Sequence, residues 1–79
     1  MICKMNLCLK YAGGGEYNKL LTYEGDSLEE IAASIQRDEN ELLQYMTTED
    51  DKGTKAFVFQ GFMFKKAGIE TAHFTEPDF

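Results

Sequence analysis

The side chains of this sequence that could do chemistry are one histidine, two cysteines and fourteen carboxylates. A catalytic histidine needs an orienting carboxylate together with a nucleophile or a substrate pocket. Glu70 and Glu76 lie near His73 in the sequence, but strand alternation predicts that both point to the opposite face. We therefore expect His73 to lie on the surface or on a sheet face without a chemical role, and we expect no enzyme.

Cys3 and Cys8 are expected to be reduced thiols with a structural role. They stand five residues apart on a predicted strand, where they point to opposite faces about 16 Å apart along the chain and cannot form a disulfide. Two cysteines and one distant histidine also lack the ligand spacing of a zinc site. We expect no metal and no cofactor.

Two further patterns lack the partners that their chemistry needs. The run Gly13–Gly15 is expected to precede a strand and has no Lys with Ser or Thr after it, so it predicts a turn and not a phosphate loop. The pairs Glu29/Glu30 and Asp38/Glu39 diverge by about 100° on a helix, which scatters their carboxylates. The stretch "EDDKG" lacks the spacing of a calcium loop. No dedicated ion site is predicted.

The most apolar stretch, "FVFQGFMF", could in principle stack nucleic-acid bases. Proteins that bind single strands in this way combine aromatic side chains with a basic groove. This chain has eight basic residues against fourteen acidic ones and a net charge of −6. We therefore assign these phenylalanines to a hydrophobic core and expect no direct binding of nucleic acid.

The charges are strongly segregated along the chain. Residues 24–51 carry ten carboxylates and only Arg37 in opposition, a net charge of −9, whereas the remainder carries four acids and seven lysines. An acidic surface can simply keep a small protein soluble, but segregation is what a surface complementary to a basic partner requires. We take these ten carboxylates as the candidate partner-binding residues: Glu24, Asp26, Glu29, Glu30, Asp38, Glu39, Glu41, Glu49, Asp50 and Asp51.

Length and composition predict one folded domain over residues 1–79. The hydrophobic fraction is 43%, with six Phe and four Tyr, which suffices for a small core. No apolar run approaches the ~20 residues that a membrane-spanning helix needs, and charged residues interrupt the apolar residues at the start of the sequence. We expect a cytoplasmic protein without a membrane segment.

Alternating apolar residues predict strands over residues 1–11 and 17–24, joined as a hairpin through the glycine loop. A helix is expected to follow, with Asp26 or Ser27 as its cap and Glu29 or Glu30 reaching back from three residues later. This first half of the chain therefore predicts two paired strands and a helix.

The helix is expected to stop near Arg37, because Asp38 and Glu39 would otherwise place two charges on its apolar stripe. We predict a strand over residues 41–48, with a second short helix over 39–46 as the alternative. Residues 55–66 predict a central strand, and residues 69–75 predict a last strand at an edge. The expected fold is α+β: an antiparallel sheet of four to five strands with one helix packed on a face, in the order ββαβββ.

In size, acidity and lack of enzymatic motifs, the chain resembles the small acidic host-takeover proteins of bacteriophages, which include DNA mimics. The resemblance implies a non-enzymatic inhibitor in the host cytoplasm that blocks a basic nucleic-acid-binding protein, for example a nucleoid-associated protein. The ten carboxylates would then stand in for phosphates. The alternative is a self-associating interaction module, a regulatory subunit or an adaptor, which forms a homodimer or binds its partner through the Phe-rich strand or the edge strand 69–75.

Overall fold

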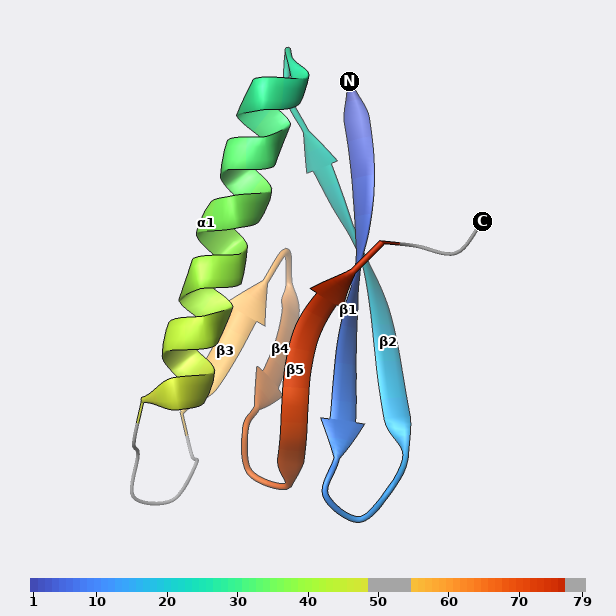
Figure 1. The fold of residues 1–79 in the computed structure, drawn as a ribbon, viewed down its shortest axis with the longest axis vertical. Coiled ribbons are helices and arrows are strands. Elements are labelled where there is room, and N and C mark those ends of the chain that lie inside the picture. The colour runs from blue at the N-terminus through green and yellow to red at the C-terminus, as the bar shows by residue number, and fades with distance from the viewer. Residues whose placement is uncertain (49–54, 77–79) are drawn as a thin grey trace.

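Figure 1 shows the computed structural model of the chain, which describes residues 1–48 and 55–76. Within these residues, five strands and one helix follow one another in the order ββαβββ. Three strands form one antiparallel sheet, and the other two form a separate antiparallel pair. The predicted α+β class and the order of the elements are confirmed. No helix in the described part of the chain is both long enough and apolar enough to cross a membrane.

Strand β1 (Ile2–Tyr11) and strand β2 (Glu16–Glu24) form the long hairpin that the alternating pattern predicts. Alternation turns every second side chain of β1 to the inner face of the sheet, where Leu7 and Leu9 are almost fully buried. Two glycines of the connecting loop adopt positive φ, which glycine accepts without a steric penalty. The predicted turn at Gly13–Gly15 is therefore confirmed.

Helix α1 (Leu28–Thr47) is continuous over 20 residues. The predicted end near Arg37 and the predicted strand over residues 41–48 are therefore wrong. The alternative of a helix over 39–46 has the correct type of structure, but these residues continue the first helix and do not start a second one. The third strand of the predicted order consequently comes from a later part of the chain.

Helix α1 continues past Arg37 because the fold accommodates the charges of Asp38 and Glu39. The carboxylate of Asp38 accepts a hydrogen bond of 2.7 Å from the hydroxyl of Tyr23 on β2, so a partner compensates its partial burial. Glu39 follows Asp38 on the helix, about 100° further around its axis, and is only partly buried. Leu42 lies eleven residues after Ile31, about three full turns, and both are buried on the same side of the helix.

The Phe-rich segment is a hairpin and not the single strand predicted over residues 55–66. Strand β3 (Ala56–Phe59) pairs with strand β4 (Phe62–Lys65) in antiparallel register. The two residues between them, Gln60 and Gly61, have φ of 45° and 81°. Positive φ at both central positions is the signature of the two-residue turn that suits the twist of paired strands.

Strand β5 (Ile69–Thr75) pairs with β1, and the strand order β2-β1-β5 puts it at an edge of the sheet, as predicted. Its register with β1 shifts between Lys10 and Tyr11. This irregularity turns Ile69 toward the core, although alternation alone predicts that it shares the face of Thr71.

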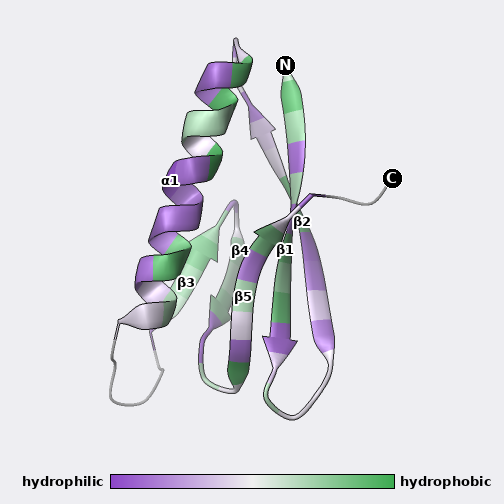
Figure 2. Ribbon diagram, in the orientation of Figure 1, coloured by the Kyte–Doolittle hydropathy of each residue, from purple (hydrophilic) through white to green (hydrophobic). Residues whose placement is uncertain are grey.

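Helix α1 and the β3–β4 hairpin cover the same face of the three-stranded sheet. The helix contacts β2, β3 and β5, and in Figure 1 both the helix and the hairpin lie to the left of the sheet. In Figure 2 the apolar colour runs along β3, whereas α1 alternates between polar and apolar residues. The core between these layers consists of Leu7, Leu9, Leu21, Tyr23, Ile31, Leu42, Phe59 and Phe64.

Hydrogen bonds join the C-terminal end of α1 to the β3–β4 hairpin and to Lys66, which follows it. The hydroxyl of Tyr45 accepts a hydrogen bond of 3.0 Å from the backbone N–H of Lys66 and donates one to the carbonyl of Lys55. The ammonium of Lys66 donates to the carbonyls of Tyr45 and Thr48. The last turn of α1 has no basic residue of its own, so Lys66 supplies the cation that favours the negative end of the helix dipole.

Candidate functional site: the acidic end and the open sheet face

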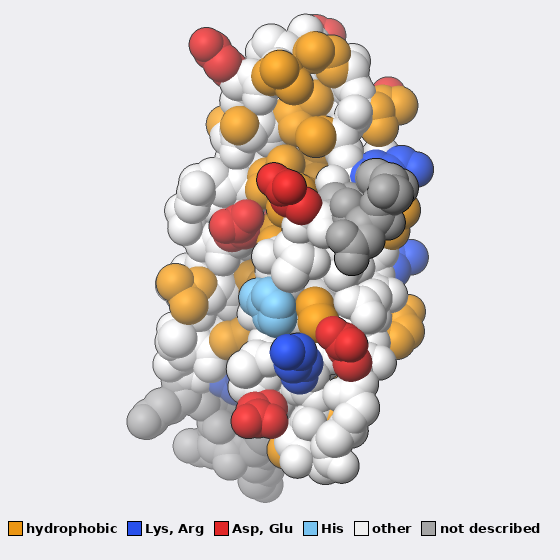
Figure 3. Space-filling view, turned by 45° about the vertical axis from the view of Figure 1, so that its right-hand side comes forward, with side chains coloured by type: hydrophobic (Ala, Val, Ile, Leu, Met, Phe, Trp, Pro, Cys, Tyr) orange, Lys and Arg blue, Asp and Glu red, His pale blue; other side chains and the backbone are white. Residues whose placement is uncertain are grey.

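Four of the predicted partner-binding carboxylates gather at one end of the molecule, where β2 stops and α1 begins. They are all exposed. At the upper end of Figure 3, acidic side chains flank a group of hydrophobic ones. We call this region the acidic end, which consists of Glu24, Asp26, Glu29 and Glu30.

One of these four carboxylates is engaged in capping the helix. Ser27 is the N-cap, and its hydroxyl accepts a hydrogen bond of 3.2 Å from the backbone N–H of Glu30. The carboxylate of Glu30 in turn accepts a hydrogen bond of 2.9 Å from the backbone N–H of Asp26. This arrangement is close to a capping box, so the predicted alternative with Ser27 and Glu30 is the correct one. The other three carboxylates have no hydrogen bond or ion pair with any described residue.

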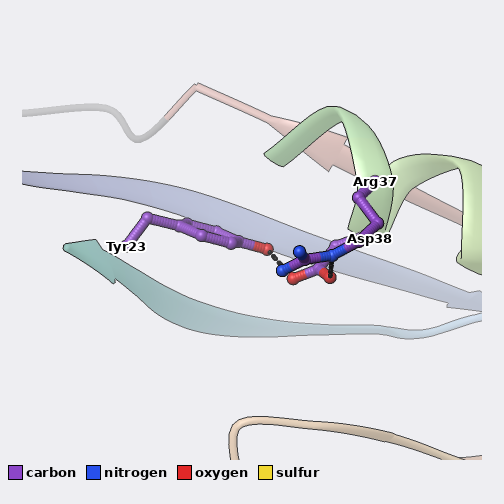
Figure 4. Close-up of polar contacts among 3 residues, drawn as sticks. All are labelled: Tyr23, Arg37 and Asp38. Carbon is purple, nitrogen blue, oxygen red and sulfur yellow. Dashed lines mark hydrogen bonds and ion pairs between the residues drawn. The ribbon is translucent and has the colours of Figure 1, made fainter. Parts of the chain in front are cut away.

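Asp38 is occupied where the helix meets the sheet. Figure 4 shows the side chains of Tyr23, Arg37 and Asp38 pointing toward one another. Arg37 approaches the Asp38 carboxylate to 3.9 Å, while the Tyr23 hydroxyl donates to it. Burial, followed by this hydrogen bond, raises the pKa of Tyr23 well above its ordinary value. Asp38 therefore serves the helix–sheet contact and is less accessible to a partner than the acidic end.

The remaining predicted carboxylates are not on one face. Glu39 lines a groove between α1 and β5, whereas Glu41 lies beside Tyr45 and the hairpin. Residues two positions apart on a helix point about 200° apart, so these two carboxylates face different sides. Glu49, Asp50 and Asp51 lie outside the described residues. Of the seven candidates that the structure describes, the fold brings together the four residues of the acidic end.

Three apolar side chains are exposed at the same end of the molecule. The exposed fractions of Met1, Ile2 and Leu28 are 62%, 63% and 64%. Leu28 continues the apolar stripe of α1 one turn beyond Ile31, where no described residue covers it. The acidic end therefore combines carboxylates with uncovered apolar surface, a combination that is common at protein–protein interfaces and unnecessary for solubility.

The outer face of the three-stranded sheet carries a second group of polar side chains. In Figure 1 the helix and the β3–β4 hairpin both lie on the other side of the sheet, and this outer face has a hollow of 530 Å³. In Figure 3 the histidine lies there beside basic and acidic side chains. The prediction that Glu76 faces away from His73 is wrong, because β5 ends at Thr75 and alternation does not extend past it. The hollow is lined by Asn6, Cys8, Lys10, Glu16, Asn18, His73, Thr75 and Glu76.

Cys8 is the most buried side chain of this hollow. It lies directly across from His73 on β5, and its thiol donates a hydrogen bond of 2.8 Å to the carboxylate of Glu16. This hydrogen bond, together with burial, raises the pKa of the Cys8 thiol. A thiol held in its protonated form is a poor nucleophile. Both Cys8 and Cys3 are free thiols, on opposite faces of β1 as predicted.

Sequence reasoning missed this group of Cys8, Glu16 and His73. The hairpin predicted around the glycine loop brings Glu16 near Cys8, so a local signal for that contact exists. The pairing of Cys8 with His73 joins residues from opposite ends of the chain, and no local pattern encodes it. Within residues 1–48 and 55–76, no group of three His, Cys, Asp or Glu side chains is placed to hold a metal ion.

Comparison with models of protein families, with curated proteins and with solved structures finds no match to this chain. What the protein does is therefore inferred from the placement of its own residues.

Proposed function

We propose that this chain is a non-enzymatic inhibitor whose acidic end docks on a basic nucleic-acid-binding protein and competes there with nucleic acid. A nucleoid-associated protein is a suitable partner, because its basic surface already recognises closely spaced phosphates. Direct binding of nucleic acid is not part of the proposal, since the net charge of −6 opposes it.

One observation carries this proposal: carboxylates without cationic partners lie beside exposed apolar side chains. Glu24, Asp26 and Glu29 contact no Lys or Arg among the described residues at ion-pair distance, and they have no role in capping α1. Unpaired like charges at one end of a small protein lower its stability slightly, and a cationic partner relieves that repulsion. The exposed apolar side chains add contact area that charges alone do not provide.

The acidic surface also extends along the helix. Glu41 follows Glu30 by eleven positions, which is close to three full turns, so the two lie on one row about 17 Å apart. Arg37 lies near this row, but its guanidinium approaches Asp38. A partner that tracks a nucleic-acid backbone can therefore meet negative charge at more than one point on α1.

The test is affinity capture from a bacterial lysate at low and at high salt. The proposal expects capture of DNA- or RNA-binding proteins that is lost as salt rises through a few tenths molar, and expects added DNA to compete for them. The triple variant Glu24→Gln, Asp26→Asn, Glu29→Gln should lose capture.

The matched control removes the same amount of charge elsewhere, with Glu16→Gln, Glu70→Gln and Glu76→Gln. This control should retain capture. The proposal fails if both triple variants lose capture equally, or if the captured proteins are neither basic nor sensitive to salt.

A second candidate function is self-association through the β3–β4 hairpin. The phenylalanines of this segment point largely toward the core, but Val58 and Met63 are cross-strand partners with exposed fractions of 58% and 63%. Two apolar side chains side by side on an outer face suit a contact between copies. Sedimentation at rising concentration tests it, and a dimer that Val58→Lys disrupts would favour this function.

A further inference from the structure

The backbone groups on the outer side of β5 can be assigned from the register of the sheet. Met1 and Gly25 exchange two hydrogen bonds, so the odd-numbered residues of β1 bond to β2 and the even-numbered residues bond to β5. His73 pairs with an even-numbered residue, so its backbone points to β1. The N–H and C=O groups of its neighbours Ala72 and Phe74 therefore point to the outer edge of the sheet.

The two edges of the sheet differ in how they are covered. At the β2 edge, the backbone N–H of Thr22 donates a hydrogen bond of 2.9 Å to the side chain of Gln60, so the hairpin turn closes that edge at this point. At the β5 edge, β1 is the only neighbouring strand among the described residues, so no strand there lies on the outer side of Ala72 and Phe74. An unpaired strand edge is a template for one more strand.

A groove of 390 Å³ runs beside this edge, between β5 and α1. Its walls are mostly apolar, and the wall residue Leu43, near the C-terminal end of α1, has an exposed fraction of 63%. The groove therefore offers side-chain contacts directly next to unpaired backbone groups. It is lined by Gln36, Glu39, Asn40, Leu42, Leu43, Met46, Ala72, His73 and Phe74.

The charges of the groove indicate the chemistry of its occupant. Glu39 is in the lining, and no Lys or Arg is among the lining residues. An added strand alternates its side chains between two faces. One face would meet the apolar wall, and the other would lie on the solvent side, where the overall field of this chain is negative.

We propose that the β5 edge and this groove bind an extended segment of a partner protein, in which apolar residues alternate with lysine or arginine, by addition of a strand to β5. This inference rests on the proposed function for the positive charge of the partner. It adds the mode of docking, in which main-chain hydrogen bonds give affinity and the groove selects the side chains.

A second copy of this chain suits the edge less well. Antiparallel pairing of two β5 strands would bring together two chains that each carry a net charge of −6 and a Glu39 in the groove. Like charges across an interface oppose association. Self-association through the β5 edge would therefore contradict the proposal.

The probe is a synthetic seven-residue peptide that alternates lysine and valine, with blocked ends, because β5 itself has seven residues. Titration into the ¹⁵N-labelled chain should shift the amide signals of Ala72 and Phe74 and slow their hydrogen exchange. A peptide with glutamate in place of lysine should not bind. A peptide methylated on alternate backbone nitrogens should lose at least tenfold in affinity, because it cannot pair with the edge.

Two variants test the groove and the edge separately. Leu43→Lys should weaken binding of the lysine–valine peptide at least tenfold, whereas Met63→Lys, a residue with the same exposed fraction of 63% on the hairpin, should change it less than twofold. Ala72→Pro removes an outward N–H without breaking the ladder to β1, which edge strands tolerate, and should also abolish binding. Urea unfolding confirms that each variant is folded.

Four results would overturn the proposal: no binding of the peptide at millimolar concentration, shifts confined to the acidic end, equal losses for Leu43→Lys and Met63→Lys, or protection of Ala72 and Phe74 by self-association in the absence of peptide. The proposed function is judged separately by lysate capture. Salt-sensitive capture without peptide binding refutes the groove alone, whereas peptide binding without capture refutes the proposed function alone.

Discussion

The middle of α1 and the acidic end beside its N-terminus carry carboxylates of the same kind in different situations. In the middle, Asp38 is largely buried, with 17% of its side chain exposed, and Tyr23 and Arg37 are its partners. At the acidic end, Glu24 and Asp26 are exposed, and their carboxylates have no partner among the described residues. The comparison separates acidic residues that the fold needs from acidic residues that it does not need.

This difference gives a criterion for reading an acidic segment. A carboxylate that stabilises the fold is recognised by a donor held at hydrogen-bond distance, as Asp38 is, or by a role in a helix cap, as Glu30 is. Carboxylates beyond that requirement are free for a partner. Substitutions should therefore affect stability in the middle of α1 and binding at the acidic end.

The largest effect on stability is expected for Tyr23→Phe. The substitution removes the hydroxyl that donates to Asp38 and leaves a mostly buried carboxylate with one donor fewer. Loss of a hydrogen bond to a charged group costs on the order of 1.5–3 kcal/mol in free energy of unfolding. Urea denaturation at neutral pH measures it. Tyr17→Phe is the control, because its ring is 44% exposed and its hydroxyl makes no hydrogen bond with a described residue; equal losses would contradict the comparison.

The same tyrosine should give a pH dependence in alkaline solution. The pKa of Tyr23 is raised above its ordinary value of 10.0 in the folded chain, first by burial and then by Asp38. Its stabilising contribution is complete below pH 10 and is lost as the pH rises toward the folded-state pKa, because the unfolded chain ionises first. The chain should lose about 1 kcal/mol between pH 10 and pH 11 through this group. The Tyr23→Phe variant should lack this part of the decline in stability. If the free energy of unfolding falls equally with pH in both proteins, Tyr23 is not the group responsible.

A smaller effect is expected where the fold meets the acidic end. Ser27→Ala removes the hydroxyl that accepts the N–H of Glu30, and loss of such a cap costs about 1 kcal/mol. Ser34→Ala is the control within the same helix, where alanine is at least as favourable as serine. Thermal unfolding of both variants measures the difference. If they unfold at the same temperature, the cap contributes nothing.

Local patterns predicted the parts of the fold that depend on neighbours in sequence. The alternation of β1, the glycine turn and the Ser27 cap all act within a few residues. The end of α1 could not be predicted in this way, because Asp38 is tolerated through Tyr23, which lies fifteen residues earlier in the chain. The turn at Gln60 and Gly61 did have a local signal, because a glycine in the middle of an apolar run indicates a turn. The aromatic residues on either side nevertheless led to the prediction of a single strand.

The candidate site also has parts that local sequence predicts and parts that it does not. Sequence segregation located the carboxylates of the acidic end, because they are neighbours in the chain. It did not reveal that Glu39 and Glu41 face different sides, since that follows from a helix that continues past residue 37. The pairing of the first and last strands places Cys8 across from His73 and forms the groove beside β5. Only the tertiary structure supplies this pairing.

The smallest effect on stability is expected at the acidic end itself. The triple variant Glu24→Gln, Asp26→Asn, Glu29→Gln leaves the cap intact and removes no hydrogen bond to a described residue. Exposed substitutions of this kind usually change the free energy of unfolding by less than about 0.5 kcal/mol. Some loss of favourable interaction between Glu29 and the helix dipole opposes some relief of repulsion between the three carboxylates, so the two contributions partly cancel.

Urea denaturation at low and high salt measures the balance of these two contributions. A variant that is as stable as the parent chain but no longer captures basic proteins would separate binding from folding at this end of the molecule. A loss of stability as large as that of Tyr23→Phe would instead mean that the acidic end serves the fold. The distinction between the middle of α1 and the acidic end would then disappear, because carboxylates at both places would be structural.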